Sequence, residues 1–289
     1  MGAKPAQAHE VRIGNFSVGP GSPLLLIAGP CVIESSDILR ETASELKSVC
    51  SRLGVNLAFK SSFDKANRSS LSSFRGPGME KGLAALDEIK REFGIPVLSD
   101  IHEKDQARPA AEVLDYIQIP AFLARQTDLL VAAARTGKPV NVKKAQFMAA
   151  ADMGYAVQKM EGQPGFAGLT LCERGASYGY HNLVVDMRSL VVLRSFGWPV
   201  VFDATHSVQL PAASSGKSGG ERRFIPALAR AASAVGVDGI FLETHPRPSE
   251  ALCDAPNQWP LAKVESLVKT LLAIRAAADR EDDNDDEQP

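Results

Sequence analysis

Eight short apolar, β-branched runs recur along this chain, and each one ends in polar, chargeable residues. In chain order the segments read GPCVIES, AFKSSF, LSDIHE, IQIPAF, NVKKAQ, LCERGA, FDATHS and FLETHP. Amphipathic helical patterns separate the runs, and such an alternation of buried strand and helix is typical of parallel β/α architecture. This repetition constrains the fold more than any other feature of the sequence.

The apolar runs predict strands at residues 24–30, 55–62, 96–102, 116–120, 140–144, 169–175, 200–206 and 239–245. Expected helices include residues 37–52, 79–93, 128–135, 183–196, 222–235 and 262–277. Asp37 is the expected N-cap of the first helix, because its carboxylate can accept free backbone N–H groups. Residues 11–16 alternate apolar with polar side chains before Gly19-Pro20-Gly21, and we interpret them as a β-hairpin that covers the bottom of a barrel.

Repeated β/α units in a chain of 289 residues match the size of one (β/α)8 TIM barrel. The alternative, an open doubly wound sheet, needs a glycine-rich turn after the first strand. The chain has Gly29-Pro30-Cys31 there and no GxGxxG, which favours the barrel. We therefore expect residues 1–278 to form a single TIM-barrel catalytic domain with an N-terminal β-hairpin. Residues 279–289 are strongly acidic and predict a disordered tail.

Composition excludes several classes of function. No apolar run approaches the roughly 20 residues of a membrane span, and no basic, apolar leader or myristoylation motif is present, so we expect a cytoplasmic protein with no membrane partner. Aromatic residues make up only 6% of the chain, without an interleaved basic stripe, which argues against nucleic acid. Four cysteines in so long a chain predict free thiols rather than a disulfide framework.

Positive charge recurs where the predicted strands end, although the formal net charge of the chain is only -2. Catalytic groups of TIM barrels come from the C-terminal ends of different strands and converge on one face. Cations that converge there suit small anionic ligands, since guanidinium groups bind phosphate or carboxylate through two hydrogen bonds. A single such cation is as often a solvated charge, but the whole set favours function: Lys60, Lys65, Arg68, Arg75, Arg125, Lys143 and Arg174.

A second group of strand-end residues mixes ligand types: Cys31, His206, Glu243 and Asp254. Thiolate, imidazole and carboxylate together suit a divalent transition ion. Taken singly, Cys31 is more often a small buried residue, His206 a hydrogen-bonded one and Glu243 half of an ion pair. The spacing alone leaves both interpretations open, and Cys253 is an alternative sulfur ligand.

Longer motifs of the chain resemble those of the 3-deoxy-D-manno-octulosonate 8-phosphate synthase family, from about Val11 to about Ala273. The motifs are FKSSFDKANRSS at residues 59–70, IQIPAFLARQTD at 117–128, NVKK at 141–144, CERG at 172–175 and DATH at 203–206. The resemblance implies a transferase of lipopolysaccharide biosynthesis that condenses phosphoenolpyruvate with D-arabinose 5-phosphate and water and releases phosphate. It also implies a homotetramer in which some sugar-phosphate contacts cross an interface.

The resemblance assigns expected roles to individual residues. Phosphoenolpyruvate would be bound by Lys65, Lys143, Arg174 and the Ala121 backbone, with Gln118 and Arg125 nearby, and the aldose phosphate by Asn67, Arg68 and Ser69. Lys60 and Asp100 would lie close to the sugar, and His102 and His206 are candidates for proton transfer. We favour His206 as a metal ligand, because a metal-bound imidazole could not transfer protons freely.

The same resemblance bears on the metal. The family divides into metal-dependent members, with Cys at the first ligand position, and metal-independent members, with Asn there. Cys31 therefore implies a divalent transition metal such as Mn, Fe or Zn, bound by Cys31, His206, Glu243 and Asp254. Ala255 departs from the more usual Cys-Asp-Gly pattern, which leaves the position of the last ligand open.

Two alternative functions remain at this point. The related 3-deoxy-D-arabino-heptulosonate 7-phosphate synthases use erythrose 4-phosphate and typically read Lys-Pro-Arg-Thr where this chain has Lys65-Ala66-Asn67-Arg68, so the local match favours the five-carbon sugar. A non-catalytic barrel that only binds phosphorylated ligands is the other alternative. Residues 207–221 are rich in Ser and Gly and have the composition either of a mobile lid or of a surface loop.

Overall fold

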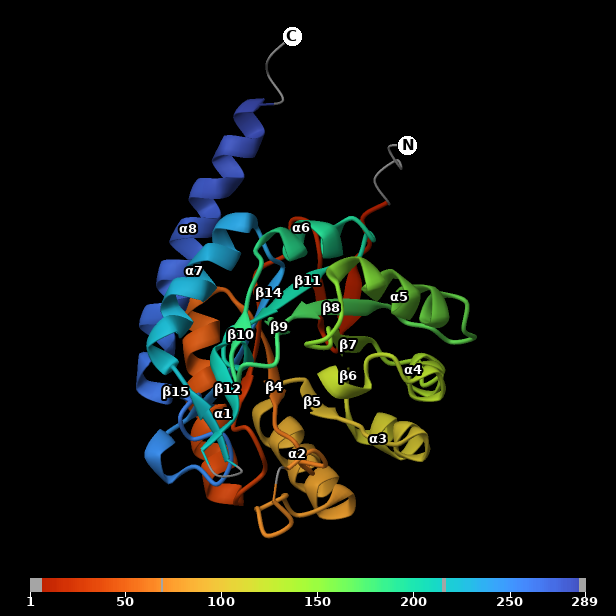
Figure 1. The fold of residues 1–289 in the computed structure, drawn as a ribbon, viewed down its shortest axis with the longest axis vertical. Helices are drawn as coiled ribbons and strands as arrows, with labels where there is room; N and C mark the ends of the chain where they lie inside the picture. The colour runs from red at the N-terminus through yellow and green to blue at the C-terminus, as the bar shows by residue number, and fades with distance from the viewer. Residues whose placement is uncertain (1–6, 69, 215–216, 286–289) are drawn as a thin grey trace.

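The computed structural model describes residues 7–68, 70–214 and 217–285. Within these residues, eight parallel strands form a closed barrel (Figure 1), because the last strand pairs with both the first and the seventh. In chain order the barrel strands are β3 (Leu25–Gly29), β4 (Asn56–Lys60), β5 (Val97–Asp100), β6 (Tyr116–Ile119), β7 (Val140–Lys143), β8 (Leu169–Glu173), β11 (Val200–Asp203) and β14 (Gly239–His245). Each lies within a predicted strand, and the predicted TIM barrel is confirmed.

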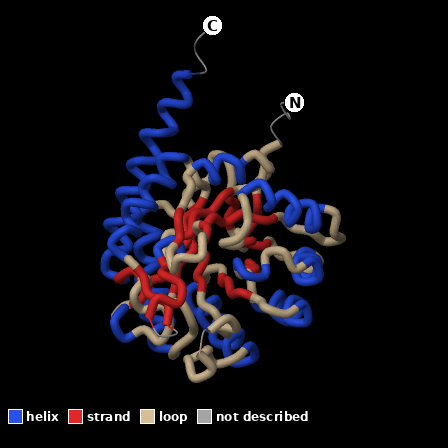
Figure 2. The backbone as a smooth tube through the Cα atoms, in the orientation of Figure 1, coloured by secondary structure: helices blue, strands red, loops and turns tan. Residues whose placement is uncertain are grey.

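Helices surround the strands on the outside of the barrel, as Figure 2 shows. They are α1 (Ser36–Leu53), α2 (Met79–Phe93), α3 (Ala107–Val113), α4 (Thr127–Ala134), α5 (Met153–Glu161), α6 (Arg188–Arg194), α7 (Ile225–Val235) and α8 (Val264–Asp285). Short 3-10 turns precede or replace helical turns in the connections: η1 (Lys104–Gln106), η2 (Ala121–Leu123), η3 (Ala150–Asp152), η4 (His206–Val208), η5 (Arg222–Phe224), η6 (Pro248–Glu250) and η7 (Leu261–Lys263).

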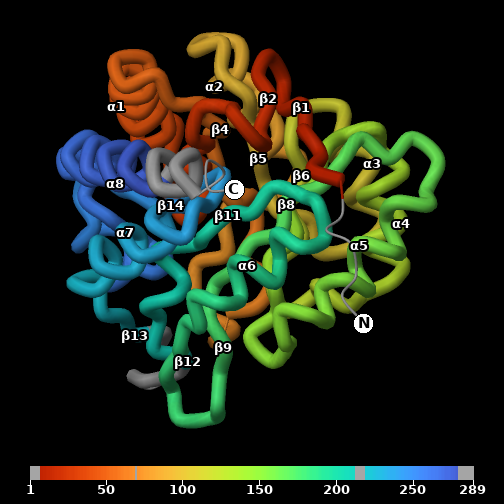
Figure 3. The backbone as a smooth tube through the Cα atoms, turned by 90° about the horizontal axis from the view of Figure 1, so that it is seen from above, coloured from red at the N-terminus to blue at the C-terminus, as the bar shows by residue number. Residues whose placement is uncertain are grey.

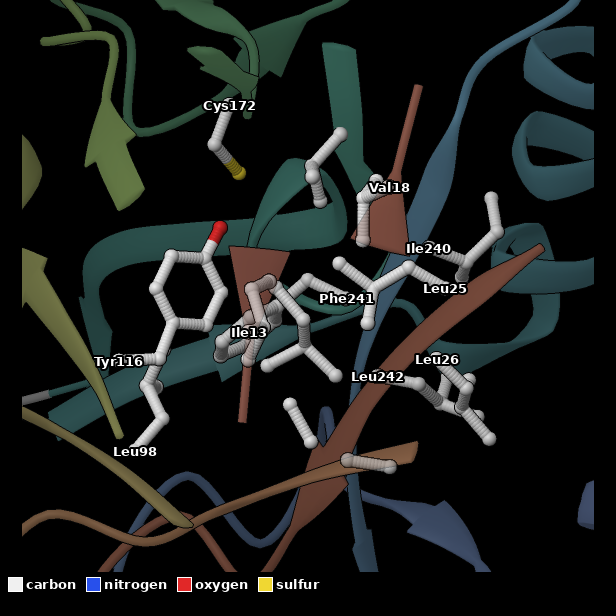
Figure 4. Packing of buried hydrophobic residues seen from close by; sticks show 14 of the residues in the cluster. Ile13, Val18, Leu25, Leu26, Leu98, Tyr116, Cys172, Ile240, Phe241 and Leu242 are labelled. Atoms are coloured by element: carbon white, nitrogen blue, oxygen red, sulfur yellow. The ribbon is translucent and has the colours of Figure 1, made fainter. Parts of the chain in front are cut away.

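The barrel strands are buried on both faces, which explains why their sequences are continuously apolar rather than alternating. Every residue of β3 and β14 is buried. Their side chains pack in the core region shown in Figure 4, where Leu26 of β3 lies beside Leu242 of β14. Burial of such side chains contributes about 25 cal/mol per Å² of apolar surface and holds the barrel closed.

The N-terminal hairpin covers the bottom of the barrel, as predicted. It consists of β1 (Val11–Ile13) and β2 (Phe16–Val18), joined by a turn in which Gly14 adopts a positive φ of 55°. The side-chain amide of Asn56, at the start of β4, donates a hydrogen bond to the carbonyl of Ser17 at 3.2 Å. Figure 3 shows the hairpin against the barrel. The opposite end, where the strands terminate, is left for the polar residues.

Two predictions about helix ends are wrong. The N-cap of α1 is Ser35 rather than Asp37, because the Ser35 hydroxyl accepts a hydrogen bond from the Ile38 amide at 3.2 Å. Asp37 instead lies in the first turn, where its charge complements the helix dipole. The helix predicted at 183–196 begins only at Arg188, because β10 (Leu183–Val184) pairs with β9 (Ala176–Ser177).

The last helix, α8, continues past its predicted end at residue 277 and reaches Asp285. It therefore includes most of the acidic segment for which we predicted disorder, and residues 286–289 lie outside the described part of the chain. Once a helix is nucleated against the barrel, each added residue brings its own hydrogen bond, so extension needs no apolar surface. The assignment of residues 1–278 to one domain stays a prediction.

The Ser- and Gly-rich segment after β11 contains a β-hairpin rather than an irregular loop. Its strands are β12 (Gln209–Ser214) and β13 (Lys217–Gly220), which pair antiparallel. The short strand β15 (Trp259–Pro260) pairs parallel with the end of β14. Whether this hairpin closes over a ligand stays a prediction. Among the described helices, none has the length and apolar character needed to cross a membrane.

Candidate active site

A pocket of about 870 Å³ lies at the C-terminal ends of the barrel strands. Most of the predicted site residues line it: Lys60, Lys65, Asn67, Arg68, Asp100, His102, Gln118, Ala121, Lys143, Arg174, His206 and Asp254. Cys31 and Glu243 are buried beside it, within reach of residues that line it. Each of these side chains stands at the end of a strand or in the loop that follows, so the barrel brings together residues far apart in the sequence.

Two of the predicted cations, Arg75 and Arg125, are not among the described residues that line the pocket. Arg125 is exposed in the segment after η2, and it is not among the described residues that line the pocket. Ser69 lies outside the described residues. Arg75, another cation of the predicted face, is exposed and pairs with Asp64. The structure therefore brings the other predicted cations together in one pocket, but not Arg75 and Arg125.

Arg174 has the features of an anion-binding residue. It is only 4% exposed, and burial lowers the pKa of its guanidinium. Its Nη2 donates to Oε1 of Gln209 at 2.8 Å, whereas its Nη1 is buried and has no hydrogen-bond partner among the described residues. Buried donors in native proteins are nearly always satisfied. The unpaired Nη1 at a pocket wall is therefore available to donate to an anionic ligand.

Lys143 lies in the same pocket as Arg174 and is buried against acidic and aromatic groups. Its Nζ is 2.5 Å from Oδ2 of Asp203 and 3.5 Å from the centre of the Phe241 ring. Burial by itself would raise the pKa of Asp203, but the charges of His206 and Lys143 outweigh it and hold that pKa well below its usual range. Asp203 is thus ionised and holds both Lys143 and His206 in place.

The metal-type residues form two adjacent clusters that share Asp254. One contains Cys31, Cys253 and Asp254, and the other contains His206, Glu243 and Asp254, with the donor atoms of each cluster within 4.8 Å of one another. Oδ2 of Asp254 lies 3.7 Å from Sγ of Cys31 and 4.0 Å from Nε2 of His206. Soft and hard donors therefore surround one small volume, as a borderline divalent ion requires.

The histidine in this set is oriented as metal-binding histidines are. Nδ1 of His206 lies 2.8 Å from Oδ2 of Asp203, while Nε2 faces Oε1 of Glu243 at 3.6 Å. A carboxylate on the other ring nitrogen fixes the tautomer and raises the basicity of a ligating imidazole. Oε2 of Glu243 is buried and has no hydrogen-bond partner among the described residues. The donor chemistry, the orientation of His206 and this unpaired oxygen all fit a divalent transition ion.

The protonation of Cys31 also depends on this environment. Burial, together with the hydrogen bond to Cys253, raises the pKa of the Cys31 thiol well above its usual value. Burial acts in the same direction on Glu243, but the charges of His206, Lys65 and Lys60 prevail and lower its pKa. Without an ion the thiol therefore keeps its proton, whereas the carboxylate is already ionised.

A hydrogen-bonded chain joins Glu243 to the far side of the pocket. Nζ of Lys60 lies 3.2 Å from Oε1 of Glu243 and donates to the Ser62 hydroxyl at 2.8 Å. That hydroxyl donates to Oδ1 of Asp100 at 2.5 Å, and Oδ2 of Asp100 lies 3.0 Å from Nε2 of His102. The other ring nitrogen of His102, Nδ1, is buried and has no hydrogen-bond partner in the described part of the chain.

The Asp100 carboxylate is held ionised in this chain. Burial favours a raised pKa, but the hydrogen bond from His102 and the charge of Lys60 lower it well below its usual range. The Asp100 anion in turn fixes the imidazole of His102, in the way that a buried carboxylate orients a catalytic histidine. The arrangement can therefore move protons at the side of the pocket opposite the metal-type residues.

Comparison with known proteins identifies the family. The sequence model of the DAHP synthetase I family matches residues 5–278. The chain belongs to this family. A 2-dehydro-3-deoxyphosphooctonate aldolase from Desulfotalea psychrophila is 57% identical over 275 residues, which cover 95% of this chain and 98% of that protein. A protein of the same name from Trichlorobacter lovleyi is 58% identical to this DAHP synthetase I family member over 267 residues, which cover 92% of this chain and 98% of that protein. Another, from Xanthomonas oryzae, is 56% identical over 266 residues, which cover 92% of this chain and 96% of that protein.

In this member of the DAHP synthetase I family, Ala255 does not disturb the last predicted ligand. The residue with a left-handed backbone is Asp254 itself, at φ 49°, and Ala255 is not among the described residues with positive φ. The carbonyl of Ala255 accepts a hydrogen bond from Arg222 at 2.5 Å, and Asn257 N donates to the Asp254 carbonyl at 2.8 Å. The loop thus holds the Asp254 carboxylate toward the cluster without a glycine at 255.

Sequence reasoning missed two polar residues of the site and named a third only as an alternative. Ser62 connects Lys60 to Asp100, and its place in the FKSS motif was the available signal. Gln209 contacts both Arg174 and Asp254, but no motif drew attention to it. Cys253 was named only as an alternative ligand, yet it lies between Arg68, at 3.0 Å, and Cys31, at 2.9 Å.

Proposed function

We propose that the protein condenses phosphoenolpyruvate with D-arabinose 5-phosphate and water to give 3-deoxy-D-manno-octulosonate 8-phosphate and phosphate. The observation that best supports this proposal is that Lys65, Lys143 and Arg174 converge in one pocket. They lie next to a cluster of thiol, imidazole and carboxylate groups that could bind a metal ion. The name of the relatives agrees with this proposal, since 2-dehydro-3-deoxyphosphooctonate is the same phosphorylated eight-carbon 2-keto acid as the proposed product.

Phosphoenolpyruvate carries a carboxylate and a phosphate, and the pocket supplies cations for both. Arg174, with its unpaired Nη1, and Lys143 bind these anionic groups, together with Lys65 and the backbone of Ala121. Gln118 lies nearby in the same wall. Fixed cations in a closed pocket neutralise charge that stays on the substrate throughout the reaction and cost no reorganisation.

Arabinose 5-phosphate binds across from phosphoenolpyruvate, with its phosphate at Asn67, Arg68 and Ser69. Arg68 lies against the loop after β14, where its Nη2 donates to the carbonyl of Leu252 at 3.2 Å. A phosphate anchored there holds the aldehyde at the other end of the sugar near C3 of phosphoenolpyruvate. This positioning turns a reaction between two bound molecules into a nearly intramolecular one.

Cys31, His206, Glu243 and Asp254 hold a divalent transition metal such as Mn, Fe or Zn. When bound, such an ion polarises an oxygen of the reactants as a Lewis acid. Around it, Lys60 and Asp100 contact the sugar, and His102, oriented by Asp100, moves a proton at its free ring nitrogen. The new bond joins C3 of phosphoenolpyruvate to the aldehyde carbon, water adds at C2, and cleavage of the C–O bond releases phosphate.

The protein is further proposed to act as a cytoplasmic homotetramer, as the resemblance to the synthases implies. Phe122, which lines the pocket, is 53% exposed, and Arg125 is exposed three residues later. Their exposure is compatible with a neighbouring subunit at this edge of the pocket. Light scattering coupled to size-exclusion chromatography measures the assembly directly, and a monomer at micromolar concentration would reject the tetramer.

The decisive experiment follows phosphoenolpyruvate consumption and phosphate release with chelator-dialysed protein, before and after Mn²⁺ or Zn²⁺ is added back. We expect turnover only with arabinose 5-phosphate and only with metal. Turnover with erythrose 4-phosphate in its place would support the heptulosonate alternative, which the Asn67-Arg68 sequence disfavours. Binding of phosphoenolpyruvate without consumption under any condition would support a non-catalytic barrel.

A further inference from the structure

The side-chain amide of Gln209 bridges two groups of the site that have different tasks. Its Oε1 accepts a hydrogen bond from Nη2 of Arg174 at 2.8 Å, and its Nε2 donates to Oδ2 of Asp254 at 2.9 Å. A guanidinium can only donate and an ionised carboxylate can only accept, so this orientation of the amide is the one that satisfies both. The amide makes both bonds at once, whereas neither an acid nor an apolar side chain could make both.

The backbone around Gln209 is held on both sides. Gln209 directly follows η4, and its backbone N–H donates to the His206 carbonyl. It is also the first residue of β12, where it pairs with Gly220. Glu221 N donates to the Val208 carbonyl at 3.0 Å and closes the base of the hairpin. The side chain of Gln209 is thus presented to the pocket from a fixed point, within three residues of His206.

We propose that Gln209 is a positioning residue that couples metal binding at Asp254 to phosphoenolpyruvate binding at Arg174. The inference rests on the proposed function and deepens it. The oxygen of Asp254 that accepts from Gln209 is the one that lies near Cys31 and His206. An ion held by this set fixes the Asp254 carboxylate, and the fixed carboxylate orients the amide.

The oriented amide then holds the guanidinium of Arg174. One nitrogen of Arg174 is engaged by Gln209, and the other, Nη1, is the buried donor that the described residues leave unpaired. Fixing the first nitrogen directs the second toward the ligand. The entropic cost of ordering the Arg174 side chain when phosphoenolpyruvate binds is therefore smaller. Metal and phosphoenolpyruvate are therefore expected to bind with positive cooperativity.

Such coupling is reciprocal by thermodynamic necessity. If the ion tightens phosphoenolpyruvate binding by a given factor, phosphoenolpyruvate tightens ion binding by the same factor. A direct attraction between the ion and the substrate anion also contributes to this factor, but it does not pass through a side chain. Removing the Gln209 amide therefore separates the two contributions, because only the share carried by hydrogen bonds is lost.

The test measures the dissociation constant of phosphoenolpyruvate by calorimetry on the full-length protein, metal-free and saturated with Mn²⁺, and then that of Mn²⁺ with and without phosphoenolpyruvate. For the wild type we expect Mn²⁺ to tighten phosphoenolpyruvate binding about fivefold or more, and the reciprocal factor to agree. Gln209→Met keeps the length of the side chain without its hydrogen bonds. In this variant Mn²⁺ should tighten phosphoenolpyruvate binding by about twofold or less, although each ligand still binds.

Two further variants make the result specific. Gln209→Asn keeps the amide but is one methylene shorter, so it cannot reach both partners and should also lose the coupling. It replaces Gln209→Met as the test variant if that protein does not fold. Gln146→Met is the matched control, because Gln146 lines the same pocket while its Oε1 has no hydrogen-bond partner among the described residues. This control should keep the wild-type coupling factor.

The outcomes distinguish the inference from the proposed function. A wild type that consumes phosphoenolpyruvate, with Gln209 variants that retain its coupling factor, overturns the inference alone. Loss of the factor in Gln146→Met as well overturns it in the same way, since the effect would then not depend on the bridge. A wild type that binds no phosphoenolpyruvate at all overturns both.

Discussion

The sulfur atoms of Cys31 and Cys253 lie 2.9 Å apart, and both side chains are buried. Cys31 follows β3, the first barrel strand, whereas Cys253 lies in the loop after β14, the last. The two thiols offer alternative sulfur donors to the cluster that contains Asp254. Among the described residues, the hydrogen-bond partners of the Cys31 sulfur all lie in this loop, whereas the Cys253 sulfur also accepts a hydrogen bond from Arg68.

The first prediction concerns which sulfur binds metal. Cys31→Ala should lose nearly all bound Mn or Zn and nearly all activity, because a thiolate with high affinity for the ion is replaced by a methyl group. Cys253→Ala should retain most of its metal. Elemental analysis of dialysed protein measures the metal content, and phosphate release measures turnover. A Cys31→Ala variant that turns over like the wild type after chelation would remove the metal from the mechanism.

Arg68 is predicted to act on the sugar phosphate alone. A hydrogen bond to a charged group contributes about 1.5–3 kcal/mol, so Arg68→Ala should raise the KM for arabinose 5-phosphate roughly 10- to 100-fold. The KM for phosphoenolpyruvate should change little. Steady-state kinetics with each substrate varied in turn decides between these effects, and equal increases in both constants would contradict the assignment.

The buried pair Lys144 and Glu173 is predicted to stabilise the strand ends that carry the proposed phosphoenolpyruvate site. Nζ of Lys144 lies 3.6 Å from Oε1 of Glu173 and donates to the carbonyl of Gly175 at 3.3 Å. Lys144→Met leaves the acid buried without its cation, and the free energy of unfolding should fall by about 3–5 kcal/mol.

The matched control for this pair is the double variant Lys144→Met/Glu173→Gln. Oε1 of Glu173 accepts the backbone amides of Arg174 and Gly175 at 2.9 and 2.5 Å, and the side-chain oxygen of a glutamine at this position would still accept both without a buried charge. The double variant should therefore be more stable than the single one. Urea unfolding of the three proteins gives the comparison, and equal losses in both variants would show that the charge is not the cause.

Stability at alkaline pH is predicted to depend on Cys50, which is buried in α1. Burial raises the pKa of its thiol from 9.0 to about 12. Because the folded-state pKa is the higher one, the contribution of this thiol is complete below the unfolded-state pKa and is lost as pH rises from about 9 toward 12. The unfolded chain ionises first, and each pH unit in this window costs about 1.4 kcal/mol.

Cys50→Ala removes this titration and leaves the other groups unchanged. The stability advantage of the wild type over Cys50→Ala, measured by urea unfolding in reductant between about pH 8 and 10.5, should be constant below about pH 8.5 and then shrink by about 1.4 kcal/mol per pH unit. A difference that stays constant over the whole range would mean that Cys50 ionises equally in both states.

The barrel was predictable because its signal is periodic and local. Each strand is an apolar run buried on both faces, and a parallel barrel places every strand's C-terminal end on one face, so Lys143, Asp100 and His206 converge whatever the details of the loops. The family motifs then supplied roles for individual residues. Residue type and strand position left the metal site open, and the family resemblance supplied the proposed ligand set; Cys31, His206, Glu243 and Asp254 do lie together.

What the sequence did not reveal depends on contacts between side chains in different loops. Gln209 meets Arg174 and Asp254 across 35 and 45 residues, and neither bond leaves a periodic pattern. The cap at Ser35 rather than Asp37 was decided by which oxygen reaches the Ile38 amide, a matter of fine register within one turn. Such choices depend on geometry finer than residue type and spacing.

Cys31 and Asp254 are 223 residues apart in sequence, yet they belong to one cluster, and they meet only because β14 pairs with β3. Since translation proceeds from the N-terminus, the thiol of Cys31 leaves the ribosome long before the carboxylate of Asp254 is made. A nascent chain therefore exposes this cysteine to oxidants and to stray metal ions for most of its synthesis. The ion that we propose for this cluster can therefore be captured only at the end of synthesis, after the last strand has closed the barrel.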